Sequence, residues 1–184
     1  MGALVKATRQ DIAALAAEEQ ARQYLTFLLG GEMFAIGILN IKEIIEYGSL
    51  TEVPMMPEYI RGVINLRGAV VPVVDLSARF GKKRTEITRR TCIVIIEVET
   101  NDEKHDVGVV VDSVSEVLEI PATEIEPAPS FGAKIRADFI QGMGKVSGKF
   151  VIILSVNNVL SLDDLALLEH AAGAEAPLLE AQQA

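Results

Sequence analysis

Arg67 is the clearest candidate for recognition chemistry, because it interrupts the most apolar part of the chain. It stands in N-L-R-G, residues 65–68, within the longer stretch V-I-N-L-R-G-A-V-V-P-V-V-D-L. A guanidinium presents a planar fork of N–H donors that matches carboxylate and carbonyl oxygens of a partner. We expect a carboxylate such as Glu43 to hold this fork. The alternative is an exposed turn residue whose ion pair contributes roughly 0–1 kcal/mol, and the sequence leaves both interpretations open.

Catalytic and metal-binding groups are harder to find. His105 and His170 have no second His, Cys or carboxylate at metal-ligand spacing, so both are expected to be solvated. Asp75 ends an apolar stretch, where it can cap or turn the chain, but one carboxylate makes no acid–base pair. Phosphate-binding loops, a dinucleotide fingerprint and a nucleophile elbow are also missing from the sequence. These observations favour a binding protein that needs no cofactor or metal.

Charge and cysteine content limit the partners and the compartment. With 17 basic and 26 acidic side chains, the net charge is −9, which disfavours nucleic acid as a partner. Cys92 cannot form a disulfide within the chain and is expected to be a buried thiol.

No leader peptide and no apolar run of about 20 residues is visible, so we expect a cytoplasmic protein without membrane insertion. A local basic run is expected to be a solvated loop; it contains Lys82, Lys83, Arg84, Arg89 and Arg90.

Short aliphatic segments dominate the middle of the chain and predict strands. Hydrophobic residues make up 49% of the sequence but aromatic residues only 5%. The apolar content is therefore rich in β-branched side chains, which favour strands. Gly, Pro, Asn and Asp separate the segments at a spacing typical of small barrels or sandwiches. The expected strands are 24–29, 33–38, 60–66, 69–76, 92–98, 107–120, 138–143 and 149–156.

The two ends of the chain differ from this strand-rich middle. Thr8 and Asp11 resemble a capping box at the start of a helix. Ser161 and Asp164 suit a second capping box, which is followed by leucines on one side of the predicted helix. The expected segments are a helical or flexible extension at 1–22, a helix at 161–172 and a flexible tail at 173–184.

An internal repeat organises the middle of the chain. F-A-I-G-I-L-N-I-K-E-I-I-E, which starts at Phe34, aligns with V-G-V-V-V-D-S-V-S-E-V-L-E, which starts at Val107, at an offset of 73. Y-I-R-G, which starts at Tyr59, aligns with F-I-Q-G, which starts at Phe139, at an offset of 80. Extra residues in the second copy account for the change of offset.

The two copies, residues 24–80 and 91–157, are each expected to form a barrel of about five strands. Each copy ends in the same hairpin, where two pairs of glycines coincide. Glycine suits such turns because it adopts positive φ without steric cost. The other turn residues differ between the copies, so the repeat does not require Arg67. The expected structural turn glycines are Gly62 with Gly142 and Gly68 with Gly148.

The segment I-L-N-I-K-E-I-I, residues 38–45, has more apolar positions than one face of a strand can bury. Most of them are expected to lie in the core, on a strand or short helix that is packed on both sides. The alternative is that some of Ile38, Ile41 and Ile44 line a groove that takes a partner helix.

Several motifs together carry a resemblance to one family. They are Q-Y-L-T-F-L-L-G-G-E-M-F-A-I-G-I-L-N-I-K-E-I-I, I-R-G-V-I-N-L-R-G-A-V-V-P-V-V-D-L, V-G-V-V-V-D-S-V-S-E-V-L-E-I, I-E-P-A-P-S-F, F-I-Q-G-M-G-K and L-D-D-L-A-L-L-E. From Gln23 to Ala171 the chain resembles the CheW family, the coupling proteins of bacterial chemotaxis. Two features depart from the family pattern. Gly37 stands where an acidic residue is common, and the segments through Arg22 and after Gly173 have no clear counterpart.

The resemblance implies an all-β fold of two SH3-like five-stranded barrels around a shared core, with short terminal helices, over residues 23–172. It implies a non-catalytic adaptor that couples the cytoplasmic tip of methyl-accepting chemoreceptors to the regulatory domain of the CheA histidine kinase, in arrays at the membrane. By this analogy the receptor's helical hairpin lies in a groove between the barrels. The implied partner-binding residues are Ile38, Ile41, Glu43, Val63, Asn65 and Arg67.

Two alternatives stay open. The same fold can serve another chemosensory pathway, such as pilus motility or surface sensing. A small β-barrel hydrolase would instead need a deep polar pocket that contains titratable groups with perturbed pKa values.

Overall fold

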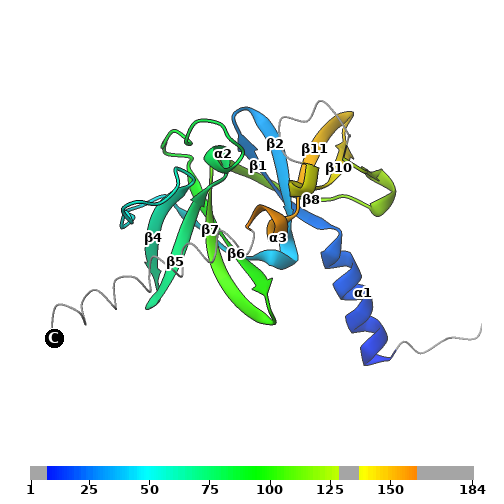
Figure 1. The fold of residues 1–184 in the computed structure, drawn as a ribbon. Coiled ribbons are helices and arrows are strands. Elements are labelled where there is room, and N and C mark those ends of the chain that lie inside the picture. Colours follow the sequence, from blue (N-terminus) through cyan, green and yellow to red (C-terminus); the bar gives the residue numbers. More distant parts are fainter. Residues whose placement is uncertain (1–7, 129–136, 161–184) are drawn as a thin grey trace, which may run out of the picture.

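Strands make up most of the structure, a computed structural model that describes residues 8–128 and 137–160, except for the side chains of residues 16–21 and 137 (Figure 1). The all-β prediction is therefore confirmed. The elements are α1 (Arg9–Ala21), β1 (Gln23–Leu29), β2 (Glu32–Gly37), η1 (Ile38–Asn40), β3 (Ile41–Glu46), β4 (Ile60–Leu66), β5 (Ala69–Asp75), α2 (Leu76–Arg79), β6 (Cys92–Thr100), β7 (Glu103–Val111), β8 (Ser113–Glu119), η2 (Ala122–Glu124), β9 (Ile125–Glu126), η3 (Ala137–Phe139), β10 (Ile140–Val146), β11 (Lys149–Leu154) and α3 (Val156–Val159).

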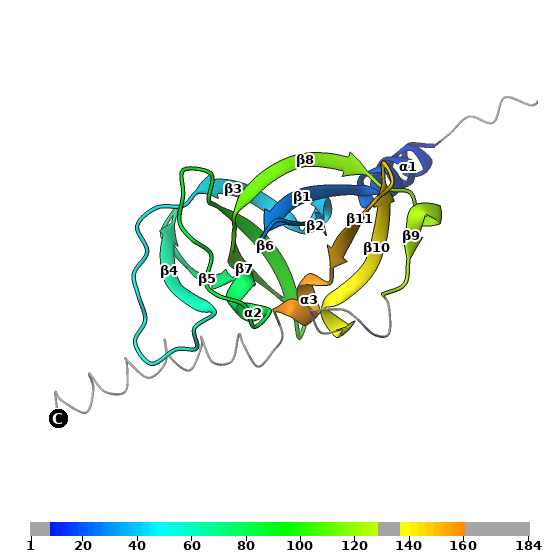
Figure 2. The same cartoon turned by 90° about the horizontal axis from the view of Figure 1, so that it is seen from above.

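The strands form two sheets that lie side by side as SH3-like barrels (Figure 2). The first barrel has the strand order β3-β6-β7-β5-β4, and the second has the order β8-β1-β2-β11-β10-β9. Neighbouring strands are antiparallel, apart from the β5–β7 pair and the β2–β11 pair, which are parallel. These two parallel pairs occupy corresponding positions, so the barrels have related topologies.

The two barrels do not coincide with the two sequence copies, which differs from the expectation. β1 and β2 come from the first copy but belong to the second barrel, and β6 and β7 of the second copy complete the first barrel. The chain crosses over at Asp112, whose N–H donates to the Leu28 carbonyl at 3.0 Å and whose carboxylate accepts from the Gly30 N–H at 2.7 Å. The single strand expected at 107–120 is therefore wrong, because it is divided into β7 and β8 in different barrels.

Bulges interrupt the hairpins of both barrels at equivalent positions. The pairing register shifts between Ile60 and Gly62 in the β4–β5 hairpin, and between Ile140 and Gly142 in the β10–β11 hairpin. A Cβ atom at Gly62 would collide with the Thr51 carbonyl, and one at Gly142 would lie 2.6 Å from Cγ2 of Ile125. Both glycines lie within strands and not in the turns where they were predicted, and there they let a neighbouring segment approach the hairpin closely.

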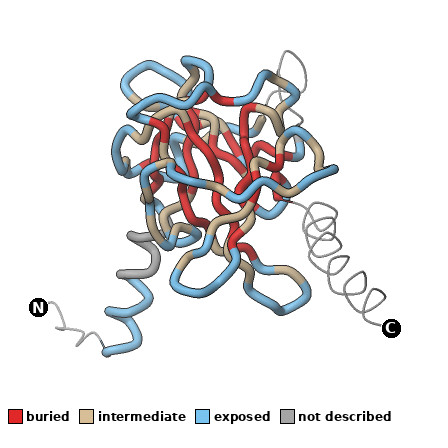
Figure 3. Tube along the Cα trace, turned by 90° about the vertical axis from the view of Figure 1, so that its left-hand side faces the viewer, coloured by how far each residue is buried: buried red, intermediate tan, exposed pale blue. Residues whose placement is uncertain are grey.

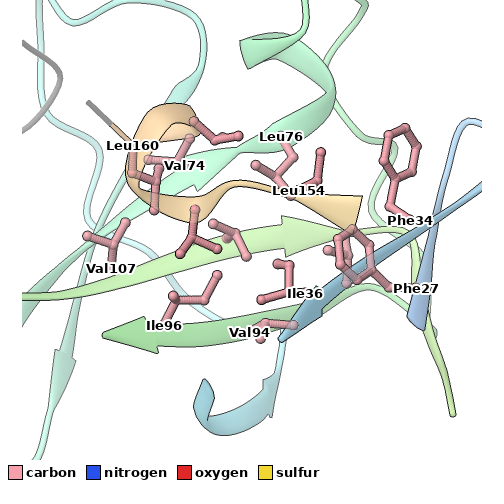
Figure 4. Close-up of a cluster of buried hydrophobic side chains, with 14 of the residues drawn as sticks. Phe27, Phe34, Ile36, Val74, Leu76, Val94, Ile96, Val107, Leu154 and Leu160 are labelled. Atoms are coloured by element: carbon pink, nitrogen blue, oxygen red, sulfur yellow. The ribbon is translucent and has the colours of Figure 1, made fainter. Parts of the chain in front are cut away.

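Alternating side chains divide the core into three clusters. On β6, Ile93 and Ile95 pack inside the first barrel, whereas Val94 and Ile96 face a larger cluster between the barrels. This shared cluster includes residues of both barrels and of the short helices (Figure 4). The predicted shared core is confirmed, and buried residues concentrate along the centre of the molecule (Figure 3). A smaller cluster inside the second barrel contains Tyr24, Ala35, Ile120, Val151 and Ile153.

Arg79, at the end of α2, connects the two barrels at their seam. Its guanidinium lies 4.9 Å from the ring centroid of Tyr59 and 5.0 Å from that of Phe139. Its Nε–H also donates to the Val159 carbonyl at 3.0 Å. A guanidinium above an aromatic ring is attracted by the ring's quadrupole. Arg79 therefore links α2, which follows the first barrel's β5, to η3 and α3, which flank the second barrel's β10–β11 hairpin.

The N-terminal helix α1 begins where the sequence predicts a capping box. The Thr8 N–H donates to the Asp11 carboxylate at 2.9 Å, and the Asp11 N–H donates to Oγ1 of Thr8 at 3.2 Å. From there α1 runs outward beside the second barrel (Figure 1). No helix among the described residues is long and apolar enough to cross a membrane. The helix predicted at 161–172 and the tail predicted at 173–184 lie outside the described residues.

Candidate partner-binding site

Arg67 occupies a strained position at the tip of the β4–β5 hairpin. Its φ is 53°, and that of Gly68 is 86°, so both central residues of the turn are left-handed. This is the pattern of a type I′ turn, which favours Asn, Asp and Gly. The equivalent turn of the second barrel repeats it, with φ of 51° at Ser147 and 76° at Gly148. The hairpin needs left-handed residues here, and an Arg in that conformation costs roughly 1 kcal/mol.

Asn65 stabilises this turn with its side chain. Its Oδ1 accepts a hydrogen bond from the Gly68 N–H at 2.9 Å. The exposed amide therefore has a structural task in addition to any contact with a partner. Its predicted partner-binding role stays a prediction.

The Arg67 guanidinium forms a bidentate ion pair with the Glu43 carboxylate. The distances are 3.0 Å from Nη1 to Oε1 and 3.0 Å from Nη2 to Oε2. The expected pairing is thereby confirmed. β3 and β4 are the outermost strands of the first barrel's sheet, so the pair links its two edges. The Arg67 side chain is still 77% exposed, so the fork is oriented but accessible.

Val63 lies on the outer face of β4, close in sequence to this ion pair. Ile64 and Leu66 pack on the cluster inside the first barrel. Because side chains alternate along a strand, Val63 and Asn65 face the opposite way. Val63 is half-buried, and its backbone pairs with Thr51 from the segment that precedes β4. It is thus placed on the same outer face as Asn65.

The isoleucines of the β2–β3 region divide between core and surface. Ile38 is half-buried in η1, and Ile41 is half-buried and packs against the shared cluster. Ile44 is 43% exposed, because it points away from the barrel. The core interpretation therefore fits Ile41, while Ile44 is the most accessible of the three. The structure joins Glu43 directly to Arg67, and it places Ile38 and Ile41 on the elements that lead to Glu43.

Gly37, which departs from the family pattern, is not required by the backbone. Its φ is −57° and its ψ is 130°, values that other residues adopt. A Cβ atom there would lie 3.5 Å from Nδ2 of Asn40, an ordinary contact distance. A side chain would fit at this position. The backbone therefore does not require glycine at this position beside η1.

Arg61 and Asp75 form a buried ion pair that the sequence analysis missed. Nε of Arg61 lies 2.8 Å from Oδ2 of Asp75, whose side chain is fully buried. The carboxylate also accepts from the Thr85 N–H at 2.9 Å and from the Ala78 N–H at 3.2 Å. The predicted capping role of Asp75 is thus confirmed, since the last bond caps α2. A signal was available in the sequence: Asp75 is the one acidic residue within residues 60–75, a stretch that also contains Arg61.

The groups available for other chemistry are few in the part of the chain that the structure describes. Within it, no group of three or more His, Cys, Asp or Glu side chains is arranged to hold a metal. A cavity at the seam is lined by apolar side chains alone, unlike the polar pocket that a hydrolase would need. Its lining residues are Ile36, Leu76, Ile96, Val109, Leu154, Val156, Val159 and Leu160.

The Cys92 thiol lies in an environment that opposes its ionisation. It is half-buried at the start of β6 rather than fully buried as expected. Burial raises its pKa, and the nearby Glu46 carboxylate raises that pKa further. A nucleophilic cysteine needs the opposite shift, toward the thiolate. Cys92 is therefore suited to packing and not to covalent chemistry.

Comparison with known proteins places this geometry in a family. Residues 23–164 match the model of the CheW-like domain. The chain is 33% identical over 161 residues to a chemotaxis protein CheW of Klebsiella aerogenes, covering 88% of this chain and 95% of that protein. It is 32% identical over 136 residues to Protein FrzA of Myxococcus xanthus, covering 73% of this chain and 82% of that protein. The crystal structure of the scaffolding protein TtCheW from Thermoanaerobacter tengcongensis aligns with a TM-score of 0.69 at 32% identity, covering 78% of this chain and 90% of that chain. The chain belongs to the CheW-like domain family.

Proposed function

We propose that this protein is a non-catalytic chemotaxis adaptor that couples methyl-accepting chemoreceptors to the CheA histidine kinase. The observation that carries the proposal is the CheW-like match over residues 23–164, which includes both barrels and the Arg67 turn. Several relatives in that match are named as chemotaxis proteins, and the structural neighbour is described as a scaffold. The role belongs in the cytoplasm, at membrane-associated receptor arrays.

The mechanism of such an adaptor is geometric. Two interfaces on one body transmit a receptor's conformational bias to a kinase only if the body does not deform. The shared cluster and the Arg79 contacts hold the two barrels together. Transient interfaces of this kind bury about 1,200–2,000 Å² or less, and avidity within an array strengthens them.

The Arg67 fork is the proposed anchor for one of these partners. Its orientation is fixed by Glu43, and its turn is held by Asn65, so little side-chain entropy is lost when a partner binds. Ile38, Ile41 and Val63 would contribute the neighbouring apolar contacts.

A second candidate function is a scaffold in another chemosensory pathway, such as pilus motility or surface sensing. The observation that favours it is the match to Protein FrzA, which has a different name at a comparable identity of 32%. Both candidates use the same fold, and they differ in the receptor and kinase that bind it.

Calorimetric titration against the CheA regulatory domain, and separately against a soluble receptor-tip fragment, tests the proposal. Binding to both partners is expected. Arg67→Ala should then weaken one interaction by more than about 1 kcal/mol, because interface arginines are frequent hot spots. Lys104→Ala is the matched control, since Lys104 is also an exposed cation of the first barrel that pairs with a carboxylate. Binding of the folded protein to neither partner would refute the adaptor role.

A further inference from the structure

The loop that joins α2 to β6, residues 80–91, carries a charge opposite to that of the rest of the protein. Residues 82–90 contain five of the 17 Lys and Arg side chains but only one of the 26 Asp and Glu side chains. Proteins with a net charge of −9 repel anions in general. This loop is therefore a local exception, and its sequence alone predicts only a solvated connection.

Hydrogen bonds hold the middle of this loop against the first barrel. The Thr85 side chain is nearly fully buried, with 5% exposure. Its N–H and Oγ1–H donate to the Asp75 carboxylate at 2.9 Å and 3.2 Å, and Arg61 donates to its carbonyl. Arg84 donates through Nε to the Glu58 carbonyl at 2.8 Å. The loop thus has a fixed path although it contains no helix or strand.

The second half of the loop is fixed in the same way. Oγ1 of Thr91 accepts from the Thr88 N–H at 2.8 Å and donates to the Glu86 carbonyl at 3.3 Å. The Thr91 carbonyl accepts from the Tyr47 N–H at 3.2 Å, which ties this half to the end of β3. A solvated connection does not need such a network. The backbone that carries these charges is therefore held in place before any partner arrives.

Three cations of this loop have no side-chain partner within the described residues. Lys82 lies 3.7 Å from Glu32, and Arg84 is bonded to a carbonyl, so these two cations are engaged. Lys83, Arg89 and Arg90 are exposed and make no ion pair or side-chain hydrogen bond there. Between them along the chain, Ile87 is 43% exposed. Ile87 together with the two exposed arginines therefore offers a partner an apolar contact beside charged hydrogen-bond donors.

We propose that this basic loop, defined by Lys83, Ile87, Arg89 and Arg90, is a docking surface for an acidic segment of a protein partner. Carboxylates of that segment would pair with the three cations, two of which are guanidinium forks suited to carboxylates. An apolar side chain of the segment would cover Ile87. The pre-formed loop reduces the entropic cost of this binding.

An acidic protein fits this surface better than other anions do. Lipid-binding clusters of 4–8 cations lie beside a membrane span or on an amphipathic helix, whereas residues 82–91 contain no helix, and nucleic-acid binding requires cations that follow a phosphate backbone. Here three free cations flank one exposed apolar residue along the chain of an acidic protein. The proposal does not depend on the adaptor function, because the basic loop is separate from the Glu43–Arg67 pair.

The test uses the full chain and a blocked peptide in which two leucines are flanked by six glutamates, with binding followed by fluorescence anisotropy. We expect binding at low salt that weakens as salt screens the charges. Combined Lys83→Glu, Arg89→Glu and Arg90→Glu should weaken it at least about tenfold. Ile87→Ser should weaken it by a smaller factor and leave its salt dependence unchanged. These substitutions spare Thr85 and Arg84, so the loop keeps its anchors, and circular dichroism verifies the fold.

Two controls separate this site from a general charge effect. Combined Arg9→Glu, Lys104→Glu and Lys149→Glu changes the net charge equally and should leave peptide binding within about twofold. A peptide with glutamine in place of glutamate should not bind. Equal losses in both triple variants would overturn the proposal. So would phosphatidylserine vesicles or a single-stranded oligonucleotide that binds the loop as tightly as the acidic peptide does. If the charge-reversed variant misfolds, the corresponding Gln variants provide the same comparison.

Discussion

The guanidinium of Arg79 donates its hydrogen bond to the carbonyl of Val159, which stands 80 residues further along the chain, the offset that relates the hairpins of the two copies. The same offset of 80 relates Tyr59 to Phe139, the two rings that flank the guanidinium. The contact therefore lies where equivalent elements of the two barrels meet. Val159 carries no charge, and the Arg79 guanidinium contacts elements of both barrels.

Arg79→Ala should destabilise the protein substantially. The substitution removes two cation–aromatic contacts and one hydrogen bond, which together contribute about 2–3 kcal/mol. Urea unfolding measures the loss. Arg84→Ala is the control, because Arg84 is exposed and also donates to a backbone carbonyl, that of Glu58. If the two variants lose similar stability, the contacts of Arg79 between the barrels stabilise the fold no more than a surface hydrogen bond does.

Gly62→Ala should be far more harmful than Gly68→Ala. The new Cβ at Gly62 would collide with the Thr51 backbone at a φ of 148°, whereas at Gly68 it would meet open space at a φ of 86°. We expect a loss of about 3 kcal/mol or more at Gly62 and of about 1 kcal/mol at Gly68. Thermal unfolding of both variants checks this order. A larger loss at Gly68 would show that the bulge tolerates a side chain.

Arg67→Gly should separate stability from binding. Glycine relieves the left-handed strain at this position, so the free energy of unfolding should stay the same or rise by up to about 1 kcal/mol, despite the loss of an exposed ion pair. Affinity for one partner should fall. Chemical denaturation together with calorimetry measures both quantities. A clear loss of stability with unchanged affinity would mean that the ion pair exists to join the edges of the first barrel.

Met55→Asn should stabilise the fold. Met55 has a φ of 62° and is fully exposed, at 102% of its reference area. Asn tolerates the left-handed region better than Met does, and no packing is lost, so a gain of about 0.5 kcal/mol is expected. The shift in the thermal midpoint provides the measurement. A lower midpoint would indicate that the Met55 side chain makes a contact that matters for folding.

The Cys92 thiol should ionise at higher pH than a free cysteine. Burial and the Glu46 carboxylate both disfavour the thiolate and raise its pKa. The midpoint of its alkylation rate against pH should therefore lie above that of a cysteine peptide measured in parallel. Glu46→Gln should move the midpoint back toward the peptide value. A midpoint below that of the peptide would contradict this account of the site.

Local features of the fold were predictable from the sequence, whereas strand partners were not. The expected strand at 60–66 has the same bounds as β4, because alternating apolar residues and the turn glycine define it locally. β1 pairs with β8 as well as with its neighbour β2, and Oγ1 of Thr26 donates to the Glu116 carbonyl across a separation of 90 residues. Nothing near Thr26 in the sequence encodes that distance. The two copies therefore suggested two separate barrels, and the exchange of strands was missed.

In the candidate site, too, one ion pair could be predicted from the sequence and another could not. The Glu43–Arg67 pair was predictable, because Glu43 and Arg67 are opposite charges that each stand within an otherwise apolar stretch. The Arg61–Asp75 pair is equally well defined in the structure, with 2.8 Å between Nε and Oδ2. It escaped notice because Asp75 alone suffices to explain a helix cap. Asp75 caps α2 and also pairs with Arg61, and only the first role follows from its place at the end of a strand.

The crossing at Asp112 also determines the order in which the chain can fold during synthesis. β1 and β2 leave the ribosome first, but their barrel is completed only when β11 follows, ending at Leu154. The first barrel is complete earlier, once β7 has emerged. From the synthesis of β2 until that of β11, the apolar faces of the β1–β2 hairpin lack their strand partners in the second barrel. This delay slows folding and exposes the nascent chain to aggregation. A ribosome-bound chain that ends before β6 contains neither barrel, although it carries the whole first sequence copy.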